Sequence, residues 1–342
     1  MSLPLNIFTP SQAAILIGVA ALLGAVFGSF VNCLAWRLVH GESVLAGRSH
    51  CTSCGHSLGV LDLIPVVSWL ALRGRCRHCG ERVSPRYVIV ELLMAALFVA
   101  LLVVYGVGAP WLAYAALACI LMGASLVDLD TYTIPNVFVI AAAVVWLLMM
   151  AASLAGAIGF PLVPAAMREP AALVAADSLL AGAAPEAVSL VFGVGSLFAP
   201  LVGAGWLAGL LDGLAGGLLV GGGILLFSLV FDAVTGKTSL GGGDVKLLFA
   251  VGLFLGAALS LLNLLVACVL GLVFAAFRLR GAPSAPCGKV VKGAAGEGAG
   301  ASPESVPPPV DKAIPFGPAI AAATMLTLLG GPLVLTWYVG LF

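Results

Sequence analysis

Two aspartates that lie far apart in the sequence each stand at the edge of a long apolar run. Asp128 closes the run 111–129, and Asp244 opens the run that follows the three glycines Gly241–Gly243. A carboxylate costs roughly 2.5 to 3.5 kcal/mol at the centre of a membrane-spanning helix, so acids within spans usually face a bundle interior or a watery cavity and serve a function. Asp128 and Asp244 are therefore a candidate catalytic pair.

Two carboxyl groups in different surroundings can act as one acid and one base. Asp244 would begin a helix, where the helix dipole favours a negative charge, whereas Asp128 would lie near the end of its helix, where the dipole opposes one. One group can then activate a water molecule while the other protonates a scissile carbonyl, so that a peptide bond is hydrolysed without a metal. The alternative is that each aspartate merely caps a helix at the membrane interface.

Three further acids are weaker candidates for the same role. Asp130 lies two residues from Asp128, so on a helix the two side chains point to nearly opposite faces and only one of them can meet Asp244. Asp232 is more simply an interfacial acid, and Asp212 is more simply an acid of a loop or a helix end.

Four cysteines form two Cys-x-x-Cys-Gly segments separated by about twenty residues. This spacing predicts a closed, structural zinc site in which a tetrahedron of thiolates holds Zn²⁺, with the ligands Cys51, Cys54, Cys76 and Cys79. Paired disulfides in an extracytoplasmic loop are the alternative. Six arginines between residues 38 and 86 instead favour the reducing cytoplasm, because cytoplasmic loops carry an excess of Lys and Arg.

The composition excludes a soluble globular domain. Of the 342 residues, 62% are hydrophobic and 9% are charged, which indicates a polytopic membrane protein. The 15 basic and 15 acidic residues balance, so net charge predicts no nucleic-acid partner. The first basic residue is Arg37, after the first apolar run, and the absence of a basic segment before that run predicts that there is no cleaved signal peptide.

Run length predicts an all-α, polytopic membrane helix bundle of about eight transmembrane helices with a small cytoplasmic four-cysteine zinc-ribbon loop. An outside N-terminus places nearly all Lys and Arg inside, together with both aspartates and the Cys-rich loop. A further span near 188–206 would invert this agreement and is rejected. The apolar runs are 12–36, 87–105, 111–129, 134–155, 208–231, 244–258, 259–279 and 316–339.

Glycines and isolated polar groups within the spans have simpler explanations than a ligand site. The glycines between 216 and 223 lack the Lys-Ser/Thr ending of a phosphate loop, so close helix packing explains them better. Polar groups near the cytoplasmic interface either pair with one another or line a substrate path, and snorkelling is an equal alternative for Arg37. The substrate-path candidates are Gly241, Gly243, Lys246, Glu91, Asn32 and Arg37.

Taken together, these residues resemble the bacterial prepilin peptidases, the type IV prepilin leader peptidases of the GxGD aspartyl protease class. The resemblance covers most of the chain except 156–207 and 281–313. It rests on Gly28-Ser29-Phe30-Val31-Asn32 with Arg37, the two cysteine segments, Ile64–Trp69, Arg73–Cys76, Ser84–Tyr87 with Glu91, Asp128–Asp130 with Ile134-Pro135-Asn136, Gly241–Leu248 and Ile314–Pro318.

The resemblance implies an enzyme of the bacterial inner membrane with its active site facing the cytoplasm. Such enzymes remove the leader of type IV prepilins and type II secretion pseudopilins after a Gly, and the matching motifs carry the catalytic roles to Asp128 and Asp244. Members with the Cys-rich loop are typically bifunctional and also methylate the new N-terminal amine from S-adenosylmethionine. No Gly-x-Gly-x-x-Gly signature supports a methyl-donor site, so that activity rests on the resemblance alone.

These expectations divide the chain into seven parts. They are a first transmembrane helix (1–37), a cytoplasmic zinc-binding, methyltransferase-associated loop (38–86), helices two to four with the first catalytic Asp (87–155), an extracytoplasmic insertion (156–207), helices five to seven with the Gly-Gly-Gly-Asp motif (208–280), a low-complexity cytoplasmic loop (281–313) and the last helix (314–342). Two competing classes are an ion-coupled transporter that uses the paired aspartates as a proton relay and a non-enzymatic assembly scaffold anchored by the zinc loop.

Overall fold

The computed structural model describes residues 3–44, 47–156, 198–202, 206–236, 241–281 and 315–339. Within these ranges the chain is built from helices and contains isolated β-bridges but no strand, which confirms the expected all-α class. Six helices of the described part are long and apolar enough to cross a membrane, and the chain is therefore a multi-pass membrane protein.

The first two long helices pack closely because glycines face their contact. Helix α1 (Pro10–His40) begins at the capping box of Thr9 and Gln12 and ends at Gly41, whose φ is 70°. A Cβ atom on Gly24 would lie 2.5 Å from a backbone oxygen of helix α3 (Arg86–Tyr105), and one on Gly28 would lie 2.9 Å from the Cα of Glu91. The small residues of α1 thus allow the close approach that the sequence predicts.

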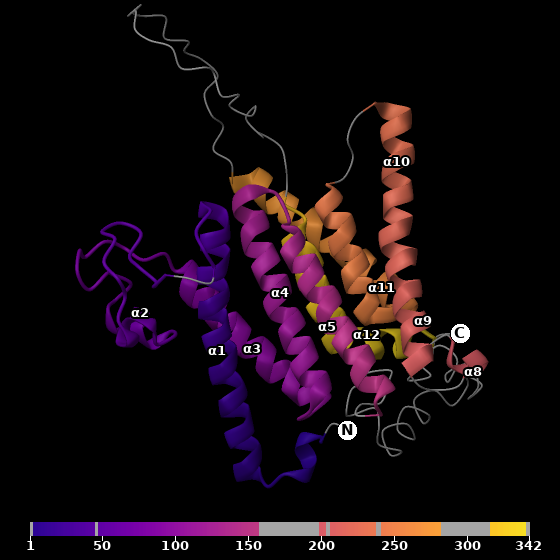
Figure 1. Cartoon of the computed structure of the whole chain (residues 1–342), viewed down its shortest axis with the longest axis horizontal. Helices are drawn as coiled ribbons and strands as arrows, with labels where there is room; N and C mark the ends of the chain where they lie inside the picture. Colours follow the sequence, from indigo (N-terminus) through magenta and orange to yellow (C-terminus); the bar gives the residue numbers. More distant parts are fainter. Residues whose placement is uncertain are drawn as a thin grey trace, which may run out of the picture.

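Helix α4 (Ala109–Thr131) forms the centre of the bundle and is the most buried of the six candidate spans. It contacts α1, α3, helix α5 (Asn136–Leu154) and helix α12 (Gly317–Val339). Large apolar side chains such as Leu117 and Leu121 are fully buried there. Helix α4, whose last turn carries Asp128, is therefore surrounded by other helices of the bundle (Figure 1).

A second pair of closely packed helices lies on the other side of the core. Helix α9 (Trp206–Gly217) continues through the π-helical turn η4 (Leu218–Gly222) into helix α10 (Gly223–Thr235), and the short helix α8 (Ala199–Val202) precedes it. A Cβ atom on Gly216 would lie 2.5 Å from the carbonyl oxygen of Gly252 in helix α11 (Gly242–Gly281), and one on Gly221 would lie 2.6 Å from Phe249. Close packing therefore explains these glycines.

Helix α11 reverses its direction at Gly256, where φ is 71° and ψ is 179°. Its first residues lie at the Asp128 end of the bundle, because Gly243 contacts Ile134 just beyond α4. Further along, Gly331 near the far end of α12 contacts Leu259, whereas Gly271 contacts Phe316 at the start of α12. The chain thus runs away from Asp128 before Gly256 and returns after it.

This reversal reconciles the eight expected runs with the six candidate spans. The runs 244–258 and 259–279 are the two segments of α11, which counts once by length, and the run 316–339 is α12, of which a shorter apolar stretch Gly317–Gly331 is recognised. The other five runs each lie in one helix or one continuous helical stretch. Most of 156–207 and nearly all of 281–313 fall outside the described residues, and of the rejected span near 188–206 only 198–202 and 206 are described.

The Cys-rich loop between α1 and α3 contains little regular structure. It includes a 3-10 turn η2 (Val60–Leu63) and a single helical turn α2 (Val67–Ala71), and a short 3-10 turn η1 (Leu5–Ile7) precedes α1. Figure 1 shows this loop projecting to the side of the helix bundle next to the end of α1.

Candidate active site and metal centre

Asp128 is buried at the end of α4 and has one firmly placed partner. The side chain is 4% exposed, and the backbone N–H of Gly317 donates a hydrogen bond of 2.9 Å to its Oδ2. Gly317 is the first residue of α12, so the positive end of that helix dipole faces the carboxylate. The helix that closes the bundle therefore orients Asp128.

Asp244 lies in the first turn of α11, where its backbone N–H donates to the carbonyl oxygen of Gly241. Two contacts fix this turn against the connection between α4 and α5. A Cβ on Gly243 would lie 3.1 Å from the Cβ of Ile134, and Lys246 Nζ donates a 3.1 Å hydrogen bond to Asn136 Oδ1. Gly241, Gly243 and Lys246 thus gather around Asp244, which is partly exposed.

The two candidate aspartates converge at the same end of the bundle. Asp128 closes α4, Asp244 opens α11, and the segment that follows α4 contacts the residue before Asp244. The contact between Ile134 and Gly243 places the connection after α4 beside the first turn of α11. One buried carboxyl and one that solvent can reach form an arrangement able to share a proton and to activate a water molecule.

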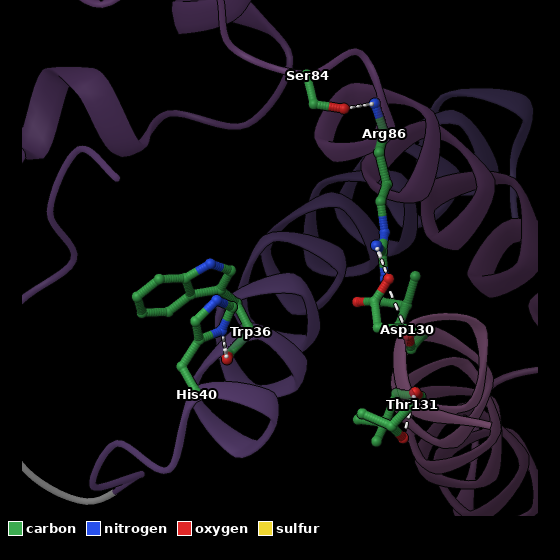
Figure 2. A network of polar contacts seen from close by, with 8 residues as sticks. Trp36, His40, Ser84, Arg86, Asp130 and Thr131 are labelled. Atoms are coloured by element: carbon green, nitrogen blue, oxygen red, sulfur yellow. Dashed lines mark hydrogen bonds and ion pairs between the residues drawn. The ribbon is translucent and has the colours of Figure 1, made fainter. Parts of the chain in front are cut away.

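Asp130 forms an ion pair with Arg86 and is not part of this site. Arg86 at the start of α3 donates from Nη1 to Asp130 Oδ1 over 2.7 Å and from Nη2 to the carbonyl oxygen of Leu126 over 2.9 Å (Figure 2). The two aspartates of the Asp-x-Asp sequence thus have different partners, Gly317 for Asp128 and Arg86 for Asp130.

Asp232 and Asp212 also have positions of their own. Asp232 lies near the end of α10, in agreement with an interfacial acid. Asp212 lies inside α9, so its assignment to a loop or helix end is wrong. Its carboxylate contacts Gly256, where an added Cβ atom would lie 2.6 Å from Oδ2. Because glycine has no side chain, position 256 leaves space for this carboxylate.

The four cysteines of the loop form one cluster. Their Sγ atoms all lie within 4.8 Å of one another, and the Sγ atoms of Cys51 and Cys79 are 3.9 Å apart. A tetrahedral zinc ion with Zn–S bonds of about 2.3 Å separates its sulfurs by about 3.8 Å. The cluster could therefore hold a metal ion, and its dimensions fit zinc.

The two cysteine segments have the same backbone geometry. Gly55 N–H donates to the carbonyl of Cys51, and Gly80 N–H donates to the carbonyl of Cys76, with φ values of 70° and 71° at the two glycines. The backbone N–H groups of Cys54 and then Ser53 lower the pKa of Cys51 to about 6, which favours the thiolate that a metal requires.

Other groups near the cluster serve the loop rather than the metal. The rings of His56 and His78 pack with their centroids 3.5 Å apart, and neither belongs to the cluster. Arg77 donates from Nε to Asp62 Oδ1 over 2.8 Å, and this hydrogen bond lowers the pKa of Asp62. That pair joins the second cysteine segment to η2.

The remaining substrate-path candidates lie between α1, α3 and the loop. Asn32 donates from Nδ2 to the carbonyl of Tyr87, Arg37 donates to the carbonyl of Ser43, and Glu91 accepts from the backbone N–H of Val66. All three side chains are more than nine-tenths buried, so Arg37 does not snorkel. The structure therefore separates Asn32, Arg37 and Glu91 from the group around Asp244.

The sequence did not single out two of these partnerships. Gly317 belongs to the Ile314–Pro318 segment, but the sequence predicts no role for it. No pattern in the neighbouring residues indicates that its backbone N–H contacts an aspartate 189 residues earlier. The bond between Val66 and Glu91 likewise joins groups 25 residues apart. A Gly between two prolines at a helix start was the available signal for Gly317.

Comparison with known proteins identifies two family segments in the chain. Residues 22–105 match the model of the bacterial peptidase A24 N-terminal domain, and residues 184–276 match that of the type IV leader peptidase family. The first match contains the four cysteines, the second contains Asp244, and Asp128 lies between them. No solved structure matches the chain.

Three curated relatives carry names that agree with these models. A protein of Escherichia coli O78:H11, named type 4 prepilin-like proteins leader peptide-processing enzyme, is 32% identical over 288 residues, which is 79% of this chain and 88% of the relative. A prepilin leader peptidase/N-methyltransferase of Bacillus subtilis is 25% identical over 95% of this chain and 98% of its own. Another protein of that name, from Myxococcus xanthus, is 40% identical over 33% of this chain and 34% of its own.

These names do not support the transporter alternative, since each of the three describes an enzyme that processes or modifies a prepilin-like protein. The similarity to the Escherichia coli protein extends over most of both chains, and the family models match on either side of Asp128. The chain therefore belongs to the type IV leader peptidase family.

Proposed function

We propose that this chain is an intramembrane aspartyl endopeptidase that removes the leader of type IV prepilins or type II secretion pseudopilins after a Gly. The observation that carries the proposal is the convergence of the end of α4, with Asp128, and the start of α11, with Asp244, at one end of the bundle. Membership of the leader peptidase family supports the substrate class.

In this mechanism the two aspartates act as one dyad. One carboxylate takes a proton from a water molecule as that water attacks the Gly carbonyl, while the other carboxyl group gives its proton to the carbonyl oxygen. The Gly317 N–H fixes Oδ2 of Asp128 and leaves Oδ1 for the reaction. Gly241 and Gly243 leave room for the substrate backbone beside Asp244, and the proton belongs to the pair.

The proposed location is the bacterial inner membrane with the dyad at the cytoplasmic face. The Arg-rich loop and the helix ends near Asp128 and Asp244 then lie inside, as the positive-inside rule requires. A substrate with a basic leader and an apolar helix would enter sideways, with the leader in the cytoplasm and the helix between spans. We assign to the seven divisions of the chain, from 1–37 to 314–342, the roles that the sequence predicts for them. The surrounding lipid is the other proposed partner.

The Cys-rich loop is proposed to bind one structural Zn²⁺ through Cys51, Cys54, Cys76 and Cys79. Four thiolates complete a tetrahedron and leave no position open, so the ion would order the loop and would not take part in cleavage. The second proposed activity is methylation of the new N-terminal amine by S-adenosylmethionine, which the names of the relatives from Bacillus subtilis and Myxococcus xanthus support.

Cleavage of a prepilin-like substrate by the purified full-length protein tests the proposal. Asp128→Asn and Asp244→Asn should each abolish cleavage, because an amide can neither give nor take the proton. Asp232→Asn, at the end of α10, is the matched control and should cleave like the unaltered protein. Cleavage that persists in either of the first two variants would contradict the proposal. A proton flux into vesicles that both substitutions abolish, while cleavage persists, would point to a transporter.

A further inference from the structure

Helix α10 differs from the other long helical segments because very little of its surface is packed. Of its 13 residues, all of which the structure describes, only Ser228 is buried. Among the described elements it contacts chiefly η4, which precedes it in the chain, and Figure 1 shows it rising apart from α11 toward its end. Large apolar side chains are exposed around the rest of its surface, namely Leu225, Leu226, Phe227, Leu229, Val230, Phe231 and Val234.

The packing changes at the π-helical turn η4. A Cβ atom on Gly216, Gly217 or Gly221 would lie 2.5, 3.0 or 2.6 Å from an atom of α11, so these glycines are needed for close contact. A Cβ atom on Gly222 or Gly223, which follow directly, would meet nothing within 4 Å. Glycine weakens a helix interior relative to alanine, so a hinge explains these two glycines better than packing does. A π turn within a helix is itself frequent at functional sites.

The unpacked helix leads directly to the first turn of α11. Residues 236–241 connect Thr235, the end of α10, to Gly242, the start of α11, and a chain of this length spans at most about 25 Å. Asp244 lies in that first turn and is partly exposed. The free end of α10 is therefore tethered close to the dyad.

The other helices near the dyad cover one another. Helix α4 packs against α5 and α12, and α11 packs against α5, α9 and α12. A polypeptide that is cut at the dyad and continues into the membrane as an apolar helix must leave beside one of the helices at that end of the bundle. Helix α10 is the one whose apolar side chains remain uncovered on all but one side.

Helical periodicity gives the orientation of α10. Gly221, Ile224 and Ser228 follow one another at intervals of three and four residues, so they share a face. Gly221 contacts Phe249 of α11, Ile224 packs against the core, and Ser228 is buried. This face is therefore the inner one, and the two flanks on either side of it are free.

Each flank of α10 presents a pair of large apolar side chains. Leu225 and Leu229 lie on one flank, and Phe227 and Phe231 lie on the other, with their rings stacked 6.2 Å apart. The 13 residues of α10 rise about 20 Å, which is roughly two thirds of a hydrocarbon core of about 30 Å. Helices in lipid associate through van der Waals contacts without a hydrophobic gain, so such a flank would bind a partner helix and still release it.

We propose that one flank of α10 binds the apolar helix of the substrate, and that Gly222 and Gly223 form the hinge at which α10 closes onto it. The leader of the substrate then reaches the dyad beyond the free end of α10. This inference rests on the proposed function, because it places the substrate of the same dyad. It identifies α10 as the wall along which that substrate enters from the lipid.

Photo-cross-linking with the purified full-length protein tests the docking surface. A photoreactive residue replaces one side chain at a time in Asp244→Asn protein, which should bind a prepilin without cutting it. Cross-links to the apolar helix of the prepilin should form at Leu225 and Leu229, or at Phe227 and Phe231. Their yield should be at least about fivefold higher than that at Leu22, an exposed apolar position of α1.

The other possible occupants of α10 give different results. Cross-links between two copies of this chain, unchanged by added prepilin, would show that a second copy covers α10. Yields no higher than that at Leu22 would leave α10 to lipid, and either result would overturn the inference. If the unaltered protein still cleaves prepilin, the peptidase proposal stands. Cross-links at α10 in a protein that does not cleave would have the reverse meaning.

Kinetics of a variant with both Gly222→Ala and Gly223→Ala test the hinge. The added atoms meet nothing within 4 Å and alanine stiffens the helix, so the fold is kept while closure is hindered. KM for prepilin should rise at least about fivefold with kcat within about twofold, because substrate binding is weakened and the dyad is untouched. Gly330→Ala should leave both constants within about twofold. An unchanged KM, or a loss confined to kcat, would overturn the hinge.

Discussion

The backbone N–H of Gly317 donates a 2.9 Å hydrogen bond to Oδ2 of Asp128 and so connects the start of α12 to the end of α4. A Cβ atom at position 317 would lie 2.8 Å from that oxygen and 3.2 Å from Cγ. Gly317→Ala must therefore displace the carboxylate. Because displacements of about 1 Å can cost on the order of 100-fold in rate, we expect kcat/KM for cleavage to fall by about 10- to 100-fold.

Gly330→Ala is the matched control for this prediction. It lies in the same helix, and a Cβ there meets nothing within 4 Å. Its cleavage rate should stay within twofold of that of the unaltered protein. Equal rates in the two alanine variants would show that the Gly317 contact does not position Asp128.

Asp130 should matter far less for cleavage than Asp128, although both belong to one Asp-x-Asp sequence. Its pair with Arg86 is partly exposed, with side chains 34% and 38% accessible, and exposed pairs contribute about 0–1 kcal/mol to stability. We expect Asp130→Asn to retain cleavage within tenfold and to lower thermal stability slightly. Kinetic assays of Asp128→Asn and Asp130→Asn side by side decide this, and an inactive Asp130→Asn would reverse the assignment of the first aspartate.

Adjacent glycines before Asp244 should respond differently to the same substitution. A Cβ on Gly243 would lie 3.1 Å from the Cβ of Ile134, whereas one on Gly242 meets nothing within 4 Å. Gly243→Ala should push α11 away from the connection after α4 and lower kcat/KM for cleavage by roughly tenfold, and Gly243→Val should lower it further. Gly242→Ala should remain within twofold. The prediction fails if both alanine variants behave alike.

The sequence predicted the fold class and the metal cluster well, because both depend on local patterns. Run length alone located the helices, and two Cys-x-x-Cys-Gly segments define four ligands at a known spacing. The partners of the acids could not be predicted in this way. Gly317 for Asp128 and Val66 for Glu91 are contacts made by backbone N–H groups, whose chemistry is the same at almost every residue.

Zinc content offers a direct test of the cluster. We expect about one zinc ion per chain by mass spectrometry, and Cys76→Ser should lose it, because the Sγ of Cys76 is one of four within 4.8 Å of one another. Cys268→Ser and Cys33→Ser are the controls, since both thiols lie outside the cluster. Retention of a full zinc complement by Cys76→Ser would exclude the four-thiolate site.

Gly256 is the point at which α11 reverses, and the reversal is what brings both ends of this helix back to the Asp128 side. Its φ of 71° and ψ of 179° belong to a region that only glycine adopts readily, at a cost of about 1–3 kcal/mol for other residues. A Cβ there would also lie 2.6 Å from Asp212 Oδ2. Gly256→Ala should therefore lower the free energy of unfolding by at least about 1–3 kcal/mol, measured by unfolding in mixed micelles.

Gly18→Ala is the control, because Gly18 is a helical position in α1 where the added Cβ atom meets nothing within 4 Å. This substitution should leave the free energy of unfolding unchanged or slightly raised. Equal stability of the two variants would mean that α11 does not need this turn, and the path by which Asp244 reaches Asp128 would then have to be redrawn.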